Sequence, residues 1–309
     1  MTTATVQRWL DAGELNLPLP GSGRTLTRWQ ALADLCELDV VAGRLAEAHS
    51  DAVAILAELR GPQARPGRLW GVWAAETPGA GLIAHHDGHA VSLSGTKAWC
   101  SGAGVCADAL VTAYTETGAR GLYAVDLRNP GVRPLESMWR NAGMADSDTR
   151  AVLFDDTPAI PVGGPDEYLT RPGFWHGAAG VAACWLGGAR AVAAPLYAAV
   201  AAAQRDNPHA AAHLGAVDTA LAAASALMAS TAEQIDADPG NTGEVAARRL
   251  RAAVETAVEN VIGRTARALG PAPLALDESH ARHVADLSMY VRQSHAEKDL
   301  AALGALVAR

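Results

Sequence analysis

The stretch LSGTKAWCSGAGVCADALVTAY, residues 93–114, decides the fold, because it places a strand-like run on each side of a small-residue turn. The runs HAVSLSG and DALVTAY are rich in residues that favour strands, and glycine, cysteine and aspartate separate them. Successive side chains of a strand point to opposite faces, so Cys100 is expected to point away from Trp99 and Ser101. We therefore expect Cys100 to pack in a core, and Trp99 and Ser101 to share the other face.

Further short runs of the same kind extend outward from this stretch, between residues 69 and 161. They read LWGVWAA, GLYAVDL and RAVLFDD, and each is bounded by glycine, proline, aspartate or asparagine. The segment HHDGH at residues 85–89 contains Asp-Gly, which is typical of a hairpin turn. This spacing of short strands predicts an antiparallel sheet or barrel.

Helical patterns flank the strands on both sides. Apolar residues recur every three or four positions over residues 24–60, and long alanine-rich runs begin near residue 172. The predicted fold class is α+β in three parts. They are a helical N-terminal region (1–65), a central antiparallel β-barrel or sandwich domain (66–165) and a C-terminal antiparallel bundle resembling four helices (166–309).

Composition narrows the classes of function. The 309 residues carry a net charge of −8 and no long basic run, which argues against a nucleic-acid partner. Four scattered cysteines without CxxC spacing indicate neither a zinc site nor a disulfide framework, and favour a cytoplasmic protein. The N-terminus lacks the pattern of a signal peptide. The apolar segment 177–203 contains Arg190 and Pro195, so we interpret it as a buried helix and predict no membrane span.

Four motifs in this order resemble the acyl-CoA dehydrogenase family of flavoproteins. They are ETPGAG (76–81), the stretch 93–114, NAGMADSDTRAVLFDD (141–156) and GGPDEYLTRPGF (163–174). The resemblance implies an FAD-dependent oxidoreductase that introduces an α,β double bond into an acyl thioester. Only about 65 residues precede the first predicted strand, so the helical domain that usually opens such chains is expected to be shortened.

The resemblance also implies which residues hold the flavin. Trp99 and Ser101 match the ring-contacting pair of the family, and Ala75 and Glu76 match the loop beside the flavin edge. Glu76 stands where the family has threonine, and Leu82 where it has serine. The arginine and phenylalanine that contact the adenosine half are absent from 206–215, and Gly270 alone remains of a later glycine turn. The alternative for Trp99 is an ordinary core tryptophan.

The catalytic glutamate of the family falls at Ser294, within DLSMYVRQSHAEKDLAALG (286–304). Glu297 and His295 lie within one helical turn of it and are the predicted catalytic residues; the alternative is a solvated charged face. A carboxylate of raised pKa suits abstraction of a proton next to a thioester. His176 and Trp175, in RPGFWHG, are predicted to line a substrate pocket, and no metal site is predicted.

Two other functions stay open from the sequence. One is a flavin-dependent monooxygenase of the same superfamily, in which His295 would act. The other is a catalytically degenerate homologue that binds an acyl group or a protein. The alanine-rich helices and the resemblance together predict a homodimer or homotetramer acting on a small molecule.

Overall fold

The computed structural model describes residues 2–76, 81–88, 90–202 and 207–308, which form two compact units. The sheet unit comprises Met1–Leu17, Leu45–Arg140 and Ala145–Phe174. The helical unit comprises Pro18–Arg44, Asn141–Met144 and Trp175–Arg309. The domain boundaries at residues 65 and 165 stay a prediction.

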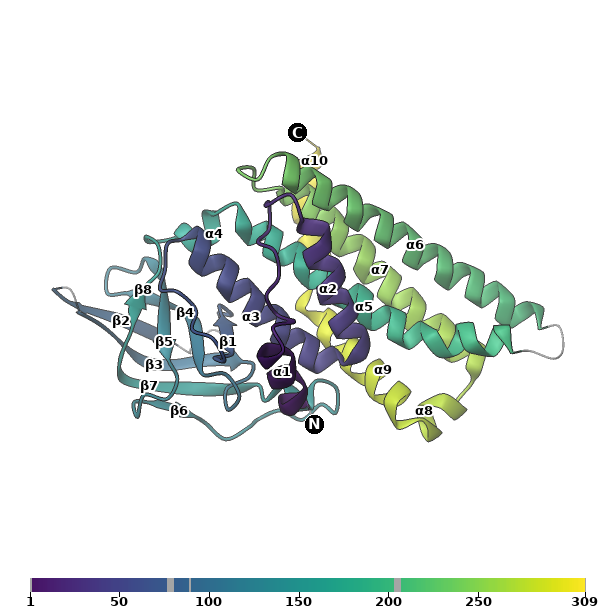
Figure 1. The fold of residues 1–309 in the computed structure, drawn as a ribbon, viewed down its shortest axis with the longest axis horizontal. Coiled ribbons are helices and arrows are strands. Elements are labelled where there is room, and N and C mark those ends of the chain that lie inside the picture. The colour runs from purple at the N-terminus through teal and green to yellow at the C-terminus, as the bar shows by residue number, and fades with distance from the viewer. Residues whose placement is uncertain (1, 77–80, 89, 203–206, 309) are drawn as a thin grey trace. The chain divides into compact units, whose positions relative to one another are not determined.

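Helices precede and follow the strands in the chain, as predicted (Figure 1). The first helices are α1 (Thr2–Asp11), α2 (Thr25–Leu38) and α3 (Val40–Glu58). The strands are β1 (Trp70–Trp73), β2 (Leu82–Asp87), β3 (Ala90–Cys100), β4 (Asp108–Thr115), β5 (Arg120–Asp126), β6 (Val132–Pro134), β7 (Arg150–Pro158) and β8 (Ile160–Pro161), with the 3₁₀ turn η1 (Ala145–Ser147) before β7. The later helices are α4 (Glu167–Thr170), α5 (Gly173–Ala201), α6 (Pro208–Ala237), α7 (Glu244–Leu269), α8 (Ala272–Leu276), α9 (Glu278–Tyr290) and α10 (Glu297–Val307), with the 3₁₀ turn η2 (Val291–Gln293) before α10.

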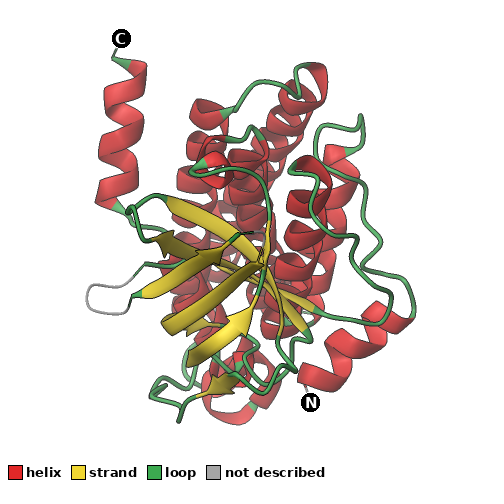
Figure 2. Ribbon diagram, turned by 90° about the vertical axis from the view of Figure 1, so that its left-hand side faces the viewer, coloured by secondary structure: helices red, strands yellow, loops and turns green. Residues whose placement is uncertain are grey.

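All eight strands belong to one curled sheet, in the order β6-β7-β3-β2-β4-β5-β8 with β1 beside β4 (Figure 2). The hairpin of β2 and β3 is antiparallel, as HHDGH predicts, but β1 and β2 both pair with β4 in parallel. The predicted α+β class with helices at both ends is confirmed, but the central sheet is mixed and open, not the antiparallel barrel or sandwich that was predicted. Its edge strands β6 and β8 are short and end in Pro134 and Pro161, which have no N–H to donate to a closing partner.

Both faces of the sheet are buried at its centre, within the sheet unit. One core lies on one face of the sheet and includes Trp73, Leu93, Cys100, Val111 and Phe154. The other joins the sheet to α3 and includes Ile55, Leu59, Trp70, Leu110 and Leu122. Neighbouring residues of β4 thus enter different cores, which fixes the register of this strand.

The helical unit is held together by close packing and by polar caps. The carboxylate of Asp236 on α6 accepts the backbone N–H and the hydroxyl of Thr25, which tie the start of α2 to α6 at 2.9 and 2.6 Å. A Cβ at Gly187 of α5 would overlap the carbonyl oxygen of Ala33 on α2, so glycine permits this approach of the two helices.

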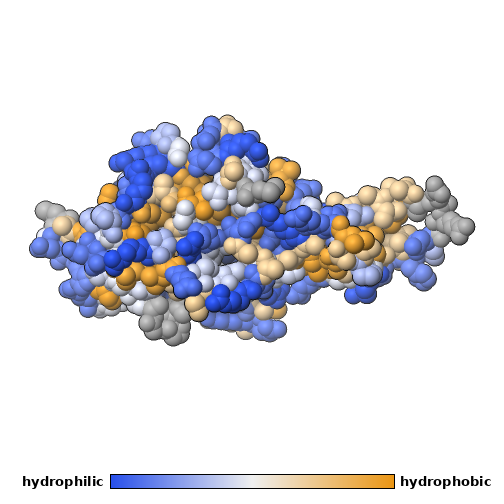
Figure 3. Space-filling model, turned by 90° about the horizontal axis from the view of Figure 1, so that it is seen from below, coloured by the Kyte–Doolittle hydropathy of each residue, from blue (hydrophilic) through white to orange (hydrophobic). Residues whose placement is uncertain are grey.

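Two helices, α5 and α6, are long and apolar enough to cross a membrane by length and composition. The apolar window of α5 is 72% buried, as in the core helix of a folded domain, and that of α6 is 22% buried. Figure 3 shows apolar side chains exposed on the helices near the 203–206 connection.

Candidate functional site

The predicted ring contact, Trp99, lies near the end of β3 with its indole exposed. Its side chain is 54% exposed and its backbone has a φ of 59°, a conformation that a bulky residue adopts only under constraint. The pairing of β3 with β7 shifts its register between Lys97 and Cys100, at the same place as this positive φ. Cys100 beside it is fully buried, and burial raises the pKa of its thiol, in line with a packing role.

A second tryptophan, Trp139, stands next to Trp99. The two rings meet edge to face, with centroids 6.1 Å apart and an interplanar angle of 86°. Met138, beside Trp139, is 76% exposed. The sequence analysis missed Trp139, because it lies in the loop between β6 and η1, where no periodicity predicts which side chains it contacts.

The hydroxyl of Ser101 belongs to a row of three hydroxyl groups. It lies 2.9 Å from the hydroxyl of Thr149, which lies 2.8 Å from that of Ser147. The carbonyl of Ser101 accepts the indole N–H of Trp73 at 2.9 Å. Ser101 is therefore fixed close to Trp99 with one hydroxyl partner.

Ala75 is exposed. The carboxylate of Glu76 points toward the sheet and is bonded to two of its residues. Glu76 Oε1 accepts from Lys97 Nζ at 3.1 Å and from the hydroxyl of Thr112 at 2.8 Å, with Arg120 at 3.6 Å. Burial lowers the pKa of Lys97, and the charge of Glu76 opposes that shift. The side chain of Glu76 is thus engaged in the sheet unit, and residues 77–80 of the ETPGAG loop lie outside the described residues.

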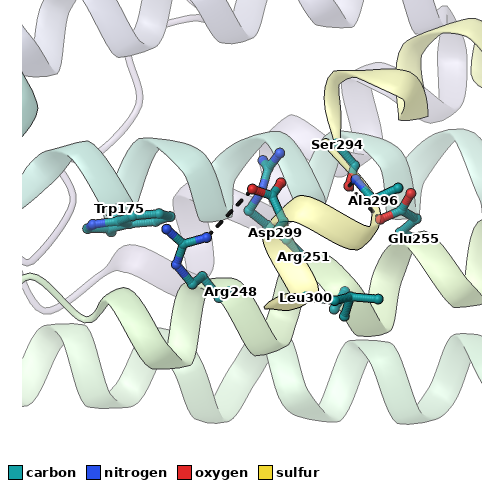
Figure 4. A pocket seen from close by; sticks show the side chains of 9 residues that line it. Trp175, Arg248, Arg251, Glu255, Ser294, Ala296, Asp299 and Leu300 are labelled. Atoms are coloured by element: carbon teal, nitrogen blue, oxygen red, sulfur yellow. Dashed lines mark hydrogen bonds and ion pairs between the residues drawn. The ribbon is translucent and has the colours of Figure 1, made fainter. Parts of the chain in front are cut away.

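A small pocket lies in the helical unit between α7 and the turn that leads into α10 (Figure 4). The volume open to the centre of a water molecule is only about 20 Å³, so it admits a few atoms and not a ring or an acyl chain. Its walls combine two arginines, two carboxylates, a serine, a tryptophan and apolar groups: Trp175, Arg248, Arg251, Ala252, Glu255, Ser294, Ala296, Asp299 and Leu300.

The arginines of this pocket are held against tryptophan rings. The guanidinium of Arg248 lies 4.3 Å from the ring centre of Trp175 and 3.6 Å from the carboxylate of Asp299. Arg251 lies 4.6 Å from the ring centre of Trp185 and donates to the carbonyl of Ala178 at 2.8 Å. These contacts fix both cations, since a guanidinium stacks on an aromatic face and keeps its donors in plane.

Ser294 and Glu255 form the shortest polar contact of the pocket. The Ser294 hydroxyl donates to Glu255 Oε2 at 2.5 Å and accepts the N–H of Ala296 at 3.1 Å. Ala296 has φ 45° and ψ −116°, a strained geometry for alanine. Glu255 is 13% exposed and lies 3.4 Å from Arg292. The sequence analysis missed Glu255, which is 39 residues away in the chain.

The predicted residues of the helical unit fall in different places. Trp175 lines the pocket, whereas His176 is buried beside it with Nε2 3.2 Å from the carbonyl of Asn241. His295 is 71% exposed, 3.7 Å from Asp299, and Glu297 is exposed in the first turn of α10. The catalytic roles of His295 and Glu297 stay predictions, and their side chains belong to the solvated face that was the alternative.

The sheet unit fits a flavin ring in one respect: Trp99 offers a flat apolar surface beside a fixed hydroxyl. The segment expected to contact the adenosine half, 206–215, forms the start of α6, except that Asp206 lies outside the described residues. Gly270 ends α7 with a φ of 70°. Among the described residues, no group of three or more histidine, cysteine, aspartate or glutamate side chains is placed to hold a metal ion.

No protein-family model and no curated protein matches this sequence. Solved structures match along nearly the whole chain. Butyryl-CoA dehydrogenase from Megasphaera elsdenii is 17% identical, with 98% of this chain and 89% of that chain covered and a TM-score of 0.84. Nitrososynthase from Micromonospora carbonacea var. africana is 18% identical, with coverage of 97% and 88% and a TM-score of 0.81.

Dibenzothiophene monooxygenase from Paenibacillus sp. A11-2 is 16% identical, with coverage of 98% and 94% and a TM-score of 0.79. A second structure of that enzyme is a complex with FMN and indole. At these identities the likeness concerns the fold. The chain has the fold of acyl-CoA dehydrogenases and of related monooxygenases, as the motifs predicted.

Proposed function

We propose that this chain is a flavin-dependent oxidoreductase of the acyl-CoA dehydrogenase type, with FAD as its flavin. The observation that carries the proposal is the exposed, strained Trp99, which lies on the sheet of this fold and offers its face to a planar ring. A strained backbone at a large apolar residue that stays more than half exposed is typical of a binding site. The likeness to butyryl-CoA dehydrogenase supports the class of reaction.

The proposed reaction is α,β-dehydrogenation of an acyl thioester. A bound flavin would supply the oxidant, taking up the β-hydrogen with two electrons. The thioester makes the α-hydrogen acidic, so the protein has to place a proton acceptor near it. Trp99 would contact the ring, with Ser101, Ala75 and the backbone of Glu76 at its edge, because the carboxylate of Glu76 is bonded inside the sheet unit.

In the helical unit, Trp175 and His176 are proposed near the reacting end of the substrate, with Glu297 and His295 as the catalytic residues taken from the sequence.

The proposed partners of the protein are a small-molecule acyl thioester and further copies of the chain, as a homodimer or homotetramer. Four free, buried cysteines support a reducing, cytoplasmic setting.

A flavin monooxygenase is the second candidate function. It is favoured by the likeness to dibenzothiophene monooxygenase, whose TM-score of 0.79 is close to that of the dehydrogenase, and by serine at position 294. In that case His295 would act on the substrate, and the reduced flavin would come from a partner.

The test is the flavin content of the purified protein. We expect a yellow protein that releases FAD on denaturation, and whose flavin absorbance bleaches when butyryl-CoA or octanoyl-CoA is added without oxygen. Retained flavin that neither probe bleaches favours the monooxygenase. A colourless protein that takes up neither FAD nor FMN contradicts both enzyme functions. It favours the remaining alternative, a catalytically degenerate homologue that binds an acyl group or a protein.

A further inference from the structure

We propose that Thr149, the residue before β7, positions the hydroxyl of Ser101 as a hydrogen-bond donor toward the flavin ring. This inference rests on the proposed function, which places Ser101 at the edge of that ring. Ser101, Thr149 and Ser147 form a row in which neighbouring hydroxyl oxygens lie 2.9 and 2.8 Å apart. The direction of the two hydrogen bonds in this row decides what Ser101 offers to a ligand.

The two backbone segments that carry the row are tied to each other. The N–H of Gly102 donates to the carbonyl of Ser147 at 2.8 Å, and that of Ala103 donates to the carbonyl of Asp148 at 3.2 Å. The N–H of Gly104 also donates to the carboxylate of Asp148 at 2.8 Å. The turn after β3 and the turn before β7 therefore hold the three hydroxyls at fixed separations, all within the sheet unit.

Burial of Ser147 sets the direction of the row at its inner end. Ser147 is 2% exposed, and Thr149 is the one hydrogen-bond partner of its hydroxyl among the residues that the structure describes. A buried donor without an acceptor is costly, because water cannot replace the lost hydrogen bond. The proton of Ser147 is therefore donated to Thr149 and does not point into the core.

The outer end of the row follows from a count of protons. Each hydroxyl has one proton and two lone pairs, so the row has three protons for two hydrogen bonds. When Ser147 donates to Thr149 and Thr149 donates to Ser101, the proton of Ser101 is left over on a partly exposed residue. The other order, in which Ser101 also donates to Thr149, gives a ligand no donor at Ser101. An acceptor beside Ser101 selects the first order, because every proton of the row is then bonded.

The row thus predicts that the ligand group beside Ser101 is a hydrogen-bond acceptor. In the proposed function, a ring on Trp99 presents its edge to Ser101, and an oxidised flavin ring carries carbonyl oxygens and unprotonated nitrogens along one edge. The carbonyl of Ser101 accepts the indole N–H of Trp73 at 2.9 Å, so the backbone at this position is held as well. Thr149 acts through Ser101 and is a positioning residue.

The experiment measures the binding of FAD, added to protein freed of flavin, by calorimetric titration. The variants are Ser101→Ala, Thr149→Val, Thr149→Ser and the double variant S101A/T149V. Thr117→Val is the matched control, because the hydroxyl of Thr117 also lies 2.9 Å from another hydroxyl, that of Thr115, but on an exposed turn after β4. The second readout is the absorption spectrum of the bound flavin, which hydrogen bonding at the ring edge shifts.

We expect T149V to weaken FAD binding roughly 3- to 10-fold, the contribution of about one hydrogen bond, and S101A to weaken it at least as much. The double variant is expected to bind within about twofold of S101A, because Thr149 acts only through Ser101. T149S keeps the hydroxyl, so its affinity and spectrum are expected to stay within about twofold and unshifted relative to wild type, as for T117V.

Wild-type affinity in T149V overturns the role of Thr149, as does a double variant whose loss is the product of the two single losses. An equal loss in T149S and T149V also overturns it, because the hydroxyl is then not the cause. These outcomes leave the proposed function unaffected. If the wild-type protein binds neither FAD nor FMN, the proposed function fails, and this inference fails with it. If circular dichroism shows T149V to be unfolded, Thr149→Ala removes the same hydroxyl without adding a methyl group, and the same outcomes decide.

Discussion

The carboxylate of Asp286 on α9 accepts the backbone N–H of Met144 at 2.5 Å. Met144 ends the short segment 141–144 that belongs to the helical unit, and it has a φ of 58°. Burial raises the pKa of Asp286, and the hydrogen bond from Met144 opposes that shift without cancelling it. Asp286 thus holds a backbone turn, although burial makes its charged form less stable than it is in water.

The raised pKa of Asp286 predicts how the free energy of unfolding depends on pH. Because the pKa of Asp286 is higher in the folded protein than in the unfolded chain, the folded state binds the proton first, and stability falls as pH rises from about 3.9 through the folded pKa. Asp286→Asn keeps an acceptor for Met144 and cannot titrate. Denaturant unfolding of both proteins at a series of pH values should show the variant gaining relative to wild type as pH rises. A difference that does not change with pH would contradict the prediction.

The pair of Lys97 and Glu76 is expected to be coupled more strongly than a surface pair. The Lys97 side chain is 5% exposed, and it donates to Glu76 and to both oxygens of Thr112. A double-mutant cycle with Lys97→Met and Glu76→Gln should give a coupling of about 1–3 kcal/mol in the free energy of unfolding.

The control cycle uses Arg133 and Asp155, which are 58% and 69% exposed and 3.6 Å apart. It should give a coupling of about 0.5 kcal/mol or less. Equal coupling in the two cycles would mean that burial adds nothing to the pair of Lys97 and Glu76.

Two glycines of α5 are expected to respond oppositely to alanine. At Gly187 a Cβ overlaps the carbonyl of Ala33, so Gly187→Ala should lower the free energy of unfolding by roughly 1–3 kcal/mol. At Gly180 the nearest atoms to a Cβ are 3.6 Å away, and Gly180→Ala should be neutral or stabilise by up to about 1 kcal/mol through helix propensity. Thermal unfolding of both variants decides this, and a stable Gly187→Ala would show that the helices are not in this contact.

Trp99 is expected to contribute to flavin binding and to strain the backbone. Trp99→Ala should weaken the binding of added FAD roughly 5- to 10-fold in calorimetric titrations, through loss of ring stacking. Trp99→Gly should lose the same affinity but be about 1 kcal/mol more stable than Trp99→Ala, since glycine adopts a φ of 59° without strain. Unchanged FAD affinity in both variants would remove Trp99 from the binding surface.

Local patterns were enough to predict the longer strands and the long helices, but not the short edge strands β6 and β8. Cys100 is buried and Trp99 is exposed, as predicted, and Asp-Gly marked the β2–β3 hairpin. Regular alternation along β3 would have buried Trp99 with Leu93 and Lys97, and the register shift between Lys97 and Cys100 reverses the faces. The parallel pairing of β1 and β2 with β4 was not predictable, because side-chain alternation is the same in parallel and antiparallel strands.

The roles of the candidate site residues stay predictions, and the sequence could bring together only residues that are neighbours in the chain. Trp99 and Ser101 are two residues apart, and the structure keeps them together. Glu255 and Ser294 meet because α7 packs beside the turn before α10, and no local pattern encodes a contact across 39 residues. The same holds for Trp139 beside Trp99, and for Glu76, whose bond to Lys97 depends on the pairing of strands.

The exposure of Trp99 also gives the protein an intrinsic optical reporter. Of the eight tryptophans, all of which the structure describes, Trp99 is the one with more than half of its side chain exposed, while Trp29, Trp73 and Trp185 are almost fully buried. A collisional quencher such as iodide will therefore quench the fluorescence of Trp99 more strongly than that of the buried tryptophans. Any molecule that covers the indole will shield it from iodide, so ligands can be screened by fluorescence before a substrate is known.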